Sequence, residues 1–423
     1  MFLSPQILQV AGAILVAAML VQVAVLLVSS VRRTAFEGER RRESLEFLRY
    51  RATAALAHSK DERERVELSW NGFRKFEIAK KDRESGDVYS FYLEPHDGKP
   101  LPAFHPGQYL TFQLKVPDQP KPVIRCYTLS DSPHHPERYR VSIKKALPPP
   151  DAPDAPPGLS SSFFNDALRE GDILDVKAPS GHFYLDTSED SAVVLIGGGI
   201  GVTPVLSMLN TICESDSKRE TWFFLGVGNH ADHVMKDHLE RLNWEHDNVH
   251  LHVCYAHPTE DDVLGKDYQH EGWVGVELFK KVLPSNNCEF YICGPPPMMD
   301  SVTTGLREWG VPDEHVNFEA FGPATVKKKR PQAEAPAGAD IEVSFSRAGK
   351  TLKWDTEAES LLDFAEDNGI VIDAGCRAGN CGTCITAIKS GEVTYINEPG
   401  EPPEAGSCLT CIAVPKANLT LDA

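Results

Sequence analysis

A group of cysteines near the C-terminus constrains this 423-residue chain more than any other feature. Cys376, Cys381 and Cys384 follow a C-x4-C-x2-C spacing in one glycine-containing loop, and Cys408 and Cys411 come later. Three thiolates from a tight loop and one from a distant strand form the ligand set of a [2Fe–2S] cluster. Zinc is the alternative, because Cys381/Cys384 and Cys408/Cys411 also make two C-x2-C pairs. The four-residue spacing and the glycines favour iron, and the spacing leaves the fourth ligand open between Cys408 and Cys411.

The segment CIAVP, which begins at Cys411, resembles the closing segment of plant-type ferredoxins and thereby selects Cys411 as the fourth ligand. Residues 341–423 as a whole resemble the β-grasp ferredoxin domain. The resemblance implies a one-electron carrier whose metal ligands are Cys376, Cys381, Cys384 and Cys411. This module is acidic, with thirteen Asp or Glu residues against six Lys or Arg residues.

The N-terminus predicts a membrane-spanning helix. The segment 7–28 contains no charged residue, and at about 1.5 Å per residue it reaches about 33 Å, enough for a hydrocarbon core of about 30 Å. A cleaved signal peptide is disfavoured, because MFLSPQ carries no positive charge and the apolar run is long. Arginines flank only its C-terminal side, which places the rest of the chain in the cytoplasm. We therefore expect residues 1–30 to be a single-pass anchor in the cell inner membrane and residues 31–69 to be a charged juxtamembrane spacer.

The hydrophobic pattern changes once between the spacer and the cysteine module. Residues 70–187 contain alternating runs such as DVYSFYLEP and YRVSIKK, which predict antiparallel strands. Residues 188–325 alternate apolar runs such as AVVLIGGG and EFYICG with helical stretches, which predicts a parallel α/β sheet. Residues 326–340 have the charged, Ala/Pro-rich composition of a linker. The net charge of −18 argues against nucleic acid as a partner, because phosphate binding needs a basic surface.

Three short motifs in residues 70–187 gain weight from their order. They are HPGQY at 105–109, RCYTLS at 125–130 and GLSS at 158–161. An arginine can bind a phosphate through two hydrogen bonds, and a tyrosine offers a flat face to an aromatic ring. In this order the motifs resemble the flavin-binding barrel of the ferredoxin–NADP reductase superfamily, which implies FAD, with FMN less favoured, and a Thr128 hydroxyl near flavin N5. The flavin contacts that the resemblance implies are His105, Gly107, Gln108, Tyr109, Arg125, Tyr127, Thr128, Ser130, Gly158, Ser160 and Ser161.

Two glycine motifs mark residues 188–325. GGGIGVTP follows an apolar strand and opens a helix, where backbone N–H groups can approach a pyrophosphate. Together with CGPPPMM at 293–299 it resembles the nicotinamide domain of the same superfamily. The contacts that this implies are Gly198, Gly199, Gly201, Thr203, Pro204, Cys293, Gly294, Pro295 and Met298.

Two further features bear on the nicotinamide coenzyme. NFEAFGPA at 317–324 resembles the closing segment of the flavohaemoglobin reductase part, which makes Phe321 a candidate at the flavin or nicotinamide site. Gly228 stands where related chains often carry Arg or Ser for a 2′-phosphate. No acidic residue for a free 2′-hydroxyl is evident in the sequence. NADH is therefore favoured over NADPH only by the absence of a phosphate-binding residue.

The predicted fold is multidomain: an N-terminal transmembrane helix, an antiparallel β-barrel flavin domain, an α/β parallel-sheet nicotinamide domain and a β-grasp [2Fe–2S] domain. This order resembles the phthalate-dioxygenase-type reductases. It implies an oxidoreductase in which Thr128, Cys293 and Phe321 position the reacting atoms for hydride transfer from NAD(P)H to FAD. Single electrons then pass through the cluster to an oxygenase component, a desaturase or a cytochrome. The alternatives are a membrane NAD(P)H:quinone oxidoreductase, a zinc-bearing adaptor on an inactive flavoprotein scaffold, and a subunit that acts only in a larger complex.

Overall fold

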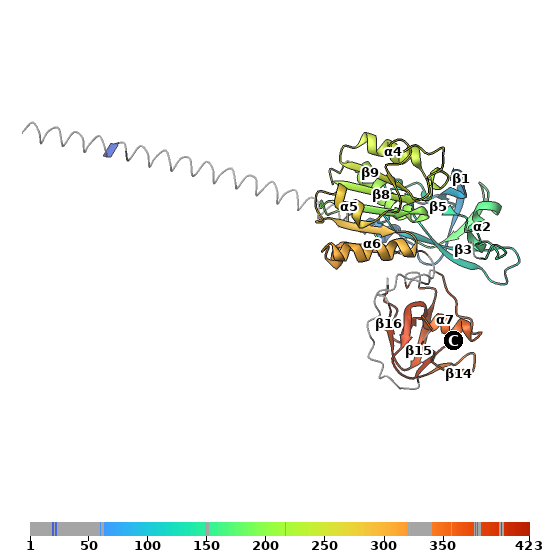
Figure 1. Ribbon diagram of the computed structural model, residues 1–423. Helices are drawn as coiled ribbons and strands as arrows, with labels where there is room; N and C mark the ends of the chain where they lie inside the picture. Colours follow the sequence, from blue (N-terminus) through green and yellow to red (C-terminus); the bar gives the residue numbers. More distant parts are fainter. Residues whose placement is uncertain are drawn as a thin grey trace, which may run out of the picture. The chain divides into compact units, whose positions relative to one another are not determined.

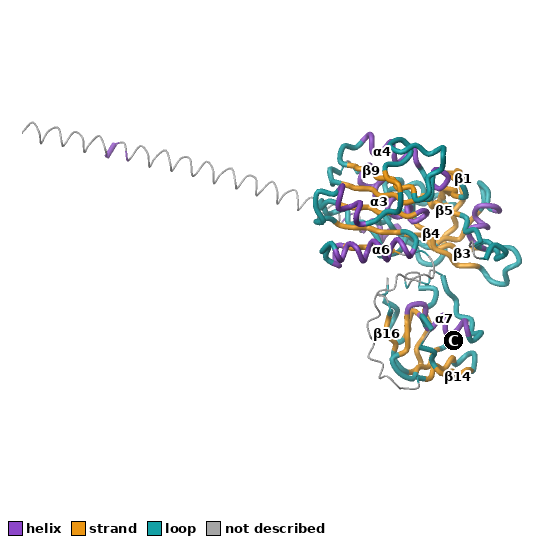
Figure 2. The backbone as a smooth tube through the Cα atoms, viewed as in Figure 1, coloured by secondary structure: helices purple, strands orange, loops and turns teal. Residues whose placement is uncertain are grey.

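The computed structural model describes residues 63–423 except 149–151, 216, 320, 322–340, 357, 376, 378, 380–381, 397–398 and 400–401, together with Met19, Leu20, Gln22 and Lys60. The chain divides into two units, Met1–Glu64 and Arg65–Ala423, and the second holds three domains (Figures 1 and 2). Within the described part of the chain, no helix has the length and apolar character needed to cross a membrane. The predicted span at 7–28, apart from three residues, and the predicted linker at 326–340 lie outside the described residues.

The first domain is an antiparallel sheet with the strand order β4-β3-β6-β1-β2-β5. A bridge between Leu129 and Val141 joins the two outer strands, so the sheet closes into a barrel. Buried Phe76, Phe91 and Phe112 fill its core, which confirms the predicted antiparallel flavin domain. Its elements are β1 (Arg74–Ser85), β2 (Val88–Pro95), β3 (Tyr109–Leu114), β4 (Val123–Thr128), β5 (Tyr139–Lys144), α2 (Leu159–Ser162) and β6 (Ile173–Val176).

The second domain is a parallel sheet with the strand order β10-β9-β8-β7-β11-β12 and helices on both faces. Alternate residues of β7 point to opposite faces, because successive side chains of a strand do so. Val193 and Leu195 pack beneath α3 and α4, whereas Val194 and Ile196 pack beneath α5 and α6. Its elements are β7 (Val193–Gly198), α3 (Val202–Glu214), β8 (Thr221–Val227), α4 (Lys236–Glu245), β9 (Val249–Tyr255), β10 (His270–Glu271), α5 (Val276–Val282), β11 (Glu289–Cys293), α6 (Pro296–Glu308) and β12 (Val316–Glu319).

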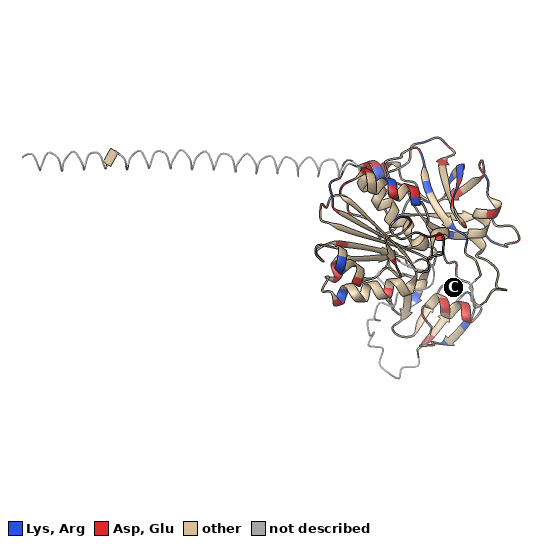
Figure 3. Cartoon of the chain, turned by 45° about the horizontal axis from the view of Figure 1, so that its top comes forward, with Lys and Arg blue, Asp and Glu red and all other residues tan. Residues whose placement is uncertain are grey.

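The third domain is a mixed sheet with the strand order β14-β13-β19-β15-β17, accompanied by the pair β16-β18. Helix α7 buries Leu361 and Phe364 against Val343 and Phe345 of β13. Acidic and basic residues occur in all three domains (Figure 3). The elements of the third domain are β13 (Glu342–Phe345), β14 (Lys350–Lys353), α7 (Leu361–Asp367), β15 (Ile385–Ser390), β16 (Val393–Tyr395), β17 (Ser407–Leu409), β18 (Ala413–Pro415) and β19 (Leu419–Leu421).

Candidate functional site

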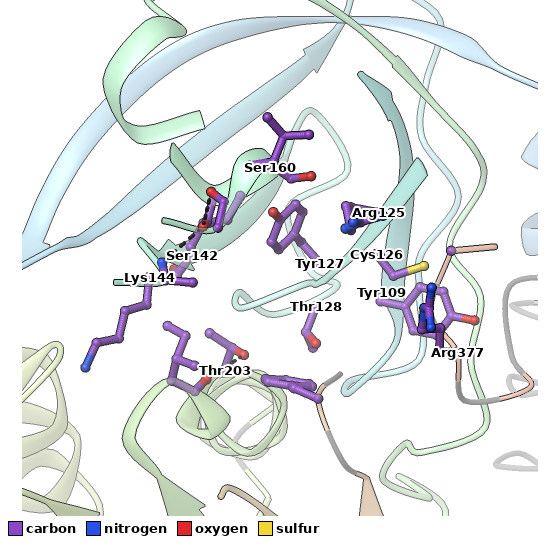
Figure 4. Close-up of a pocket in the computed structure, with 18 of the residues that line it drawn as sticks. Tyr109, Arg125, Cys126, Tyr127, Thr128, Ser142, Lys144, Ser160, Thr203 and Arg377 are labelled. Atoms are coloured by element: carbon purple, nitrogen blue, oxygen red, sulfur yellow. Dashed lines mark hydrogen bonds between the residues drawn. The ribbon is translucent and has the colours of Figure 1, made fainter. Parts of the chain in front are cut away.

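A pocket of about 550 Å³ brings the flavin-motif residues and the nicotinamide-motif residues to one place (Figure 4). Strand β4 supplies four consecutive lining residues, Arg125 to Thr128. The antiparallel register pairs Thr128 with Tyr109 of β3, which also lines the pocket. The predicted residues that line this pocket are Tyr109, Arg125, Tyr127, Thr128, Gly158, Ser160, Ser161, Thr203 and Phe321.

The Tyr127 ring is fixed by aromatic packing. Its centroid lies 5.1 Å from that of Phe164 and 5.8 Å from that of Phe112, both in edge-on geometry. Burial raises the pKa of the Tyr127 phenol, so the ring stays neutral in the physiological range. A rigid, neutral aromatic face beside the buried Thr128 side chain suits the isoalloxazine ring of a flavin.

The two serines of the GLSS motif have different roles. The Ser161 hydroxyl donates to the Gly158 carbonyl at 3.1 Å and accepts from the Ala146 N–H at 3.0 Å, so it holds the loop together. The Ser160 side chain lines the pocket, and among the described residues its buried Oγ has no hydrogen-bond partner. A buried hydroxyl is costly unless it is bonded, and a phosphate oxygen of FAD would provide that partner. The pocket therefore fits a flavin nucleotide with a phosphate near Ser160.

Four of the predicted flavin contacts lie outside this pocket and serve the barrel instead: His105, Gly107, Gln108 and Ser130. The His105 N–H donates to the Gln108 Oε1 at 2.9 Å, and the His105 ring stacks on Tyr184. Gly107 has φ +113, and an added Cβ would lie 2.4 Å from the Phe183 carbonyl oxygen. Ser130 is fully buried, and its Oγ lies 2.8 Å from the Ser142 Oγ. The predicted flavin contacts of His105, Gly107, Gln108 and Ser130 stay predictions.

The two nicotinamide motifs meet at the carboxyl ends of β7 and β11. An added Cβ on Gly201 would lie 2.4 Å from the Cys293 carbonyl oxygen, and one on Gly294 would lie 3.1 Å from the Gly198 Cα. These glycines therefore allow the two loops to touch each other. Gly199, with φ +54, has no atom within 4 Å of such a Cβ, so its backbone is open to a ligand.

Helix α3 begins at this contact. Gly201 is its N-cap and has no side chain to cap the helix. The positive end of the helix dipole favours an anion such as a pyrophosphate there. Thr203 lines the pocket, whereas Gly198, Gly199, Gly201, Pro204, Cys293, Gly294, Pro295 and Met298 do not.

Glu319 is a pocket residue that the sequence motifs did not identify. It ends β12 and is paired in register with Cys293 of β11. Burial raises the pKa of the Glu319 carboxyl from its usual 4.5 to about 8, so this group is largely protonated at neutral pH. The Cys293 thiol is fully buried, and burial raises its pKa well above the usual value. Cys293 therefore does not supply a thiolate, and it lies outside the lining of the pocket.

Other pocket residues also escaped the motifs. The carboxyl end of a parallel strand is where α/β sheets bind ligands, and this rule was the available signal for Glu319. The β5 residues carry no such signal, because they lie in an ordinary alternating strand. The pocket residues outside the predicted set are Cys126, Ser142, Ile143, Lys144, Ala146, Leu159, Ile200, Glu319, Gly375 and Arg377.

The cysteine module brings two of its predicted ligands together. The Sγ atoms of Cys384 and Cys411 lie 3.1 Å apart, beyond the length of a disulfide bond. Cys376 and Cys381 lie outside the described residues. Cys408 packs in the hydrophobic core with β13 and α7, and burial raises the pKa of its thiol to about 12. An added Cβ on Gly379 would lie 2.4 Å from the Ile412 Cδ1, so the loop needs a glycine there. The arrangement fits a cluster held partly by Cys384 and Cys411.

Comparisons with known proteins match each of the three domains. The oxidoreductase FAD-binding domain matches residues 75–184, the oxidoreductase NAD-binding domain matches 195–304, and the 2Fe-2S iron-sulfur cluster binding domain matches 345–416. These segments fall inside the predicted domains, whose outer bounds stay predictions.

Related proteins match either two or all three of these domains. A flavohemoprotein of Bacillus thuringiensis subsp. konkukian is 42% identical over 258 residues, which cover 61% of this chain and 63% of that protein. The chain thus spans somewhat less than two thirds of the curated relatives it matches. The flavohem-like FAD/NAD-binding domain of nitric oxide dioxygenase from Vibrio cholerae superimposes with a TM-score of 0.53 and 28% identity, covering 60% of this chain and 100% of that one. Phthalate dioxygenase reductase superimposes with a TM-score of 0.51 and 26% identity, covering 84% of this chain and 98% of that one.

The three domains make this chain an NAD(P)H-dependent flavin and iron–sulfur oxidoreductase. FAD, a nicotinamide nucleotide and a [2Fe–2S] cluster are its cofactors, as the motifs predicted. Within this class its flavin and nicotinamide domains are similar to the reductase module of flavohemoproteins, and its three-domain order is similar to that of phthalate dioxygenase reductase.

Proposed function

We propose that this chain supplies single electrons from NAD(P)H to a separate oxygenase component, desaturase or haem protein. The observation that carries the proposal is its likeness to phthalate dioxygenase reductase over 84% of this chain and 98% of that one. That likeness includes the [2Fe–2S] domain, which a reductase acting only on two-electron acceptors would not need.

The pocket residues bind and orient the reactants. Tyr127 would support the flavin ring, Thr128 would orient its reacting edge, and Ser160 would bind a phosphate oxygen. The N-terminus of α3 holds the coenzyme pyrophosphate. A bound FAD would supply the exchange between two-electron hydride transfer and one-electron transfer. The protonated Glu319 carboxyl can donate a hydrogen bond into the pocket without adding a negative charge beside the coenzyme.

The test separates electron delivery from coenzyme oxidation. A chain tagged at its C-terminus is cross-linked in native membranes, and the captured proteins are identified and then reduced in a purified system with NADH. The matched control is Cys411→Ser, which removes one cluster ligand and leaves the flavin and nicotinamide domains intact. We expect a captured oxygenase, desaturase or haem protein to be reduced by the native chain and not by the variant. Equal partner reduction by both chains would overturn the proposal.

A second candidate, supported by the charge-free segment 7–28, is a membrane NAD(P)H:quinone oxidoreductase. We propose that this segment anchors the chain in the inner membrane with the catalytic domains on the cytoplasmic side. Recovery of the chain alone, with fast quinone reduction that Cys411→Ser leaves intact, would favour the quinone function. Fractionation of a chain lacking residues 1–30 tests the anchor, because the shortened chain should leave the membrane fraction.

A further inference from the structure

The loop that follows the carboxyl end of β8 carries an acidic residue, Asp232. In dinucleotide-binding sheets, an Asp or Glu after the second strand accepts a hydrogen bond from a free ribose 2′-hydroxyl, whereas an arginine nearby holds a 2′-phosphate. Strand β8 is the second strand of the β7–α3–β8 unit, and Asp232 follows it in the loop 228–232. Asp232 is about half exposed, so a ligand can reach its carboxylate.

The Asp232 carboxylate lies close to Gly228. An added Cβ on Gly228 would lie only 2.8 Å from the Asp232 Oδ2. The Asp232 carboxylate therefore occupies the space into which a serine or arginine at position 228 would extend. A negative charge fills the position from which such a side chain would bind a 2′-phosphate.

A cation from the flavin domain is already paired with this carboxylate. Lys144, from β5 of the flavin domain, places its Nζ 3.0 Å from the Asp232 Oδ1. Figure 4 shows the Lys144 side chain extending away from Tyr127 and Thr128. Lys144 could attract a 2′-phosphate only if Asp232 no longer neutralised it.

An exposed tryptophan and further acidic residues follow β9, the strand next to β8. The His257 N–H donates to the Gly228 carbonyl at 2.8 Å, and the His257 ring packs edge-on against Trp273 at 5.5 Å. Trp273 is 75% exposed, so its indole face is available for stacking. The exposed Glu260 and Asp261 follow in the same loop after β9.

We propose that Asp232 makes this chain selective for NADH, by accepting a hydrogen bond from the ribose 2′-hydroxyl and by repelling the 2′-phosphate of NADPH. Adenine stacks on Trp273 beside it. This inference rests on the proposed use of a nicotinamide coenzyme and adds the identity of that coenzyme. A hydrogen bond from the 2′-hydroxyl to a carboxylate is worth about 1.5 kcal/mol, which corresponds to about tenfold in affinity.

The experiment compares binding and hydride transfer in the full FAD-loaded chain. ADP-ribose and 2′-phospho-ADP-ribose are titrated by calorimetry, and anaerobic flavin bleaching is followed with NADH and with NADPH. We expect the native chain to favour the unphosphorylated ligand and NADH by at least about tenfold. Asp232→Asn should weaken binding of ADP-ribose and reduce the selectivity by about tenfold. We expect Asp232→Asn also to bind 2′-phospho-ADP-ribose more tightly, because the Lys144 ammonium group is released from its ion pair. The double variant Asp232→Asn/Lys144→Gln should lose this tighter binding.

Asp247→Asn is the matched control. It makes the same charge change just before the amino end of β9, on the side of the sheet away from the carboxyl ends of the strands. It should leave the selectivity at the native value. Equal affinities of the native chain for the two ADP-ribose probes would overturn the inference, as would an Asp232→Asn variant with native selectivity. Selective binding of ADP-ribose without flavin bleaching by either coenzyme would instead refute the proposed function and leave the recognition of the ribose supported.

Discussion

Replacing Gly201 with alanine tests whether contact between the two nicotinamide loops positions the coenzyme. The Gly201 backbone, with φ −61 and ψ −6, suits alanine, so only the lack of space opposes the change. The new Cβ would lie 2.4 Å from the Cys293 carbonyl oxygen, whereas real Cβ contacts essentially never fall below 3.0 Å. The loops must therefore separate by at least about 0.6 Å, and by about 1.0 Å to reach ordinary contact at 3.4 Å.

That displacement sets the expected effect. Overpacking of this kind costs about 1–3 kcal/mol of stability, and a misplacement of about 1 Å can slow a reaction by about a hundredfold. We expect Gly201→Ala to slow anaerobic flavin reduction by NADH between about tenfold and a hundredfold. Gly275→Ala is the control, because an added Cβ at Gly275 meets no atom within 4 Å and its φ of −167 is ordinary extended backbone. Native flavin reduction rates and melting temperature in Gly201→Ala would refute the reasoning.

Three further predictions concern the carboxyl, the serine and the sulfur ligands. Glu319→Gln should stabilise the protein progressively as the pH rises from about 4.5 to about 8, because the native carboxyl stays protonated while the unfolded one ionises. The pKa shift is worth at most about 5 kcal/mol, and because the side chain is partly exposed we expect a gain of about 2 kcal/mol. Melting experiments at pH 5 and pH 8 measure this gain. A constant difference across that range would contradict this. Ser160→Ala should weaken FAD binding about tenfold, because a hydrogen bond to a phosphate is lost. Ser162→Ala is the control and should leave FAD binding unchanged, because its buried hydroxyl lies outside the pocket. Titration of the flavin-free chain with FAD measures both affinities. Cys411→Ser should abolish the cluster and Cys408→Ser should retain it, as iron content and visible absorption will show.

The sequence predicted the regular part of the fold because the patterns there are strong. The runs DVYSFYLEP and EFYICG correspond to β2 and β11, whose side chains alternate or are buried throughout. Strands β10 and β12 gave no such signal. Strand β10 is only two residues long, and β12 has every residue half-buried, so neither shows a hydrophobic period.

The sequence motifs predicted the pocket residues that lie within the motifs. They missed the pocket residues whose position depends on tertiary packing. Tyr127 and Thr128 line the pocket as their order suggested. Ser130, only two residues further on, points inward to Ser142 instead. Glu319 and Asp232 were missed because their place after parallel strands gives only a general signal, and the residues they meet are set by tertiary packing.

The most direct test of the central claim is an anaerobic titration of the full chain with NADH, followed by visible absorption and electron paramagnetic resonance. We predict uptake of about three electrons per chain, two by FAD and one by the cluster, with the paramagnetic signal of a reduced [2Fe–2S] centre. Bleaching of the flavin alone, with a cluster that stays oxidised at the end point, would contradict the proposed route of electrons.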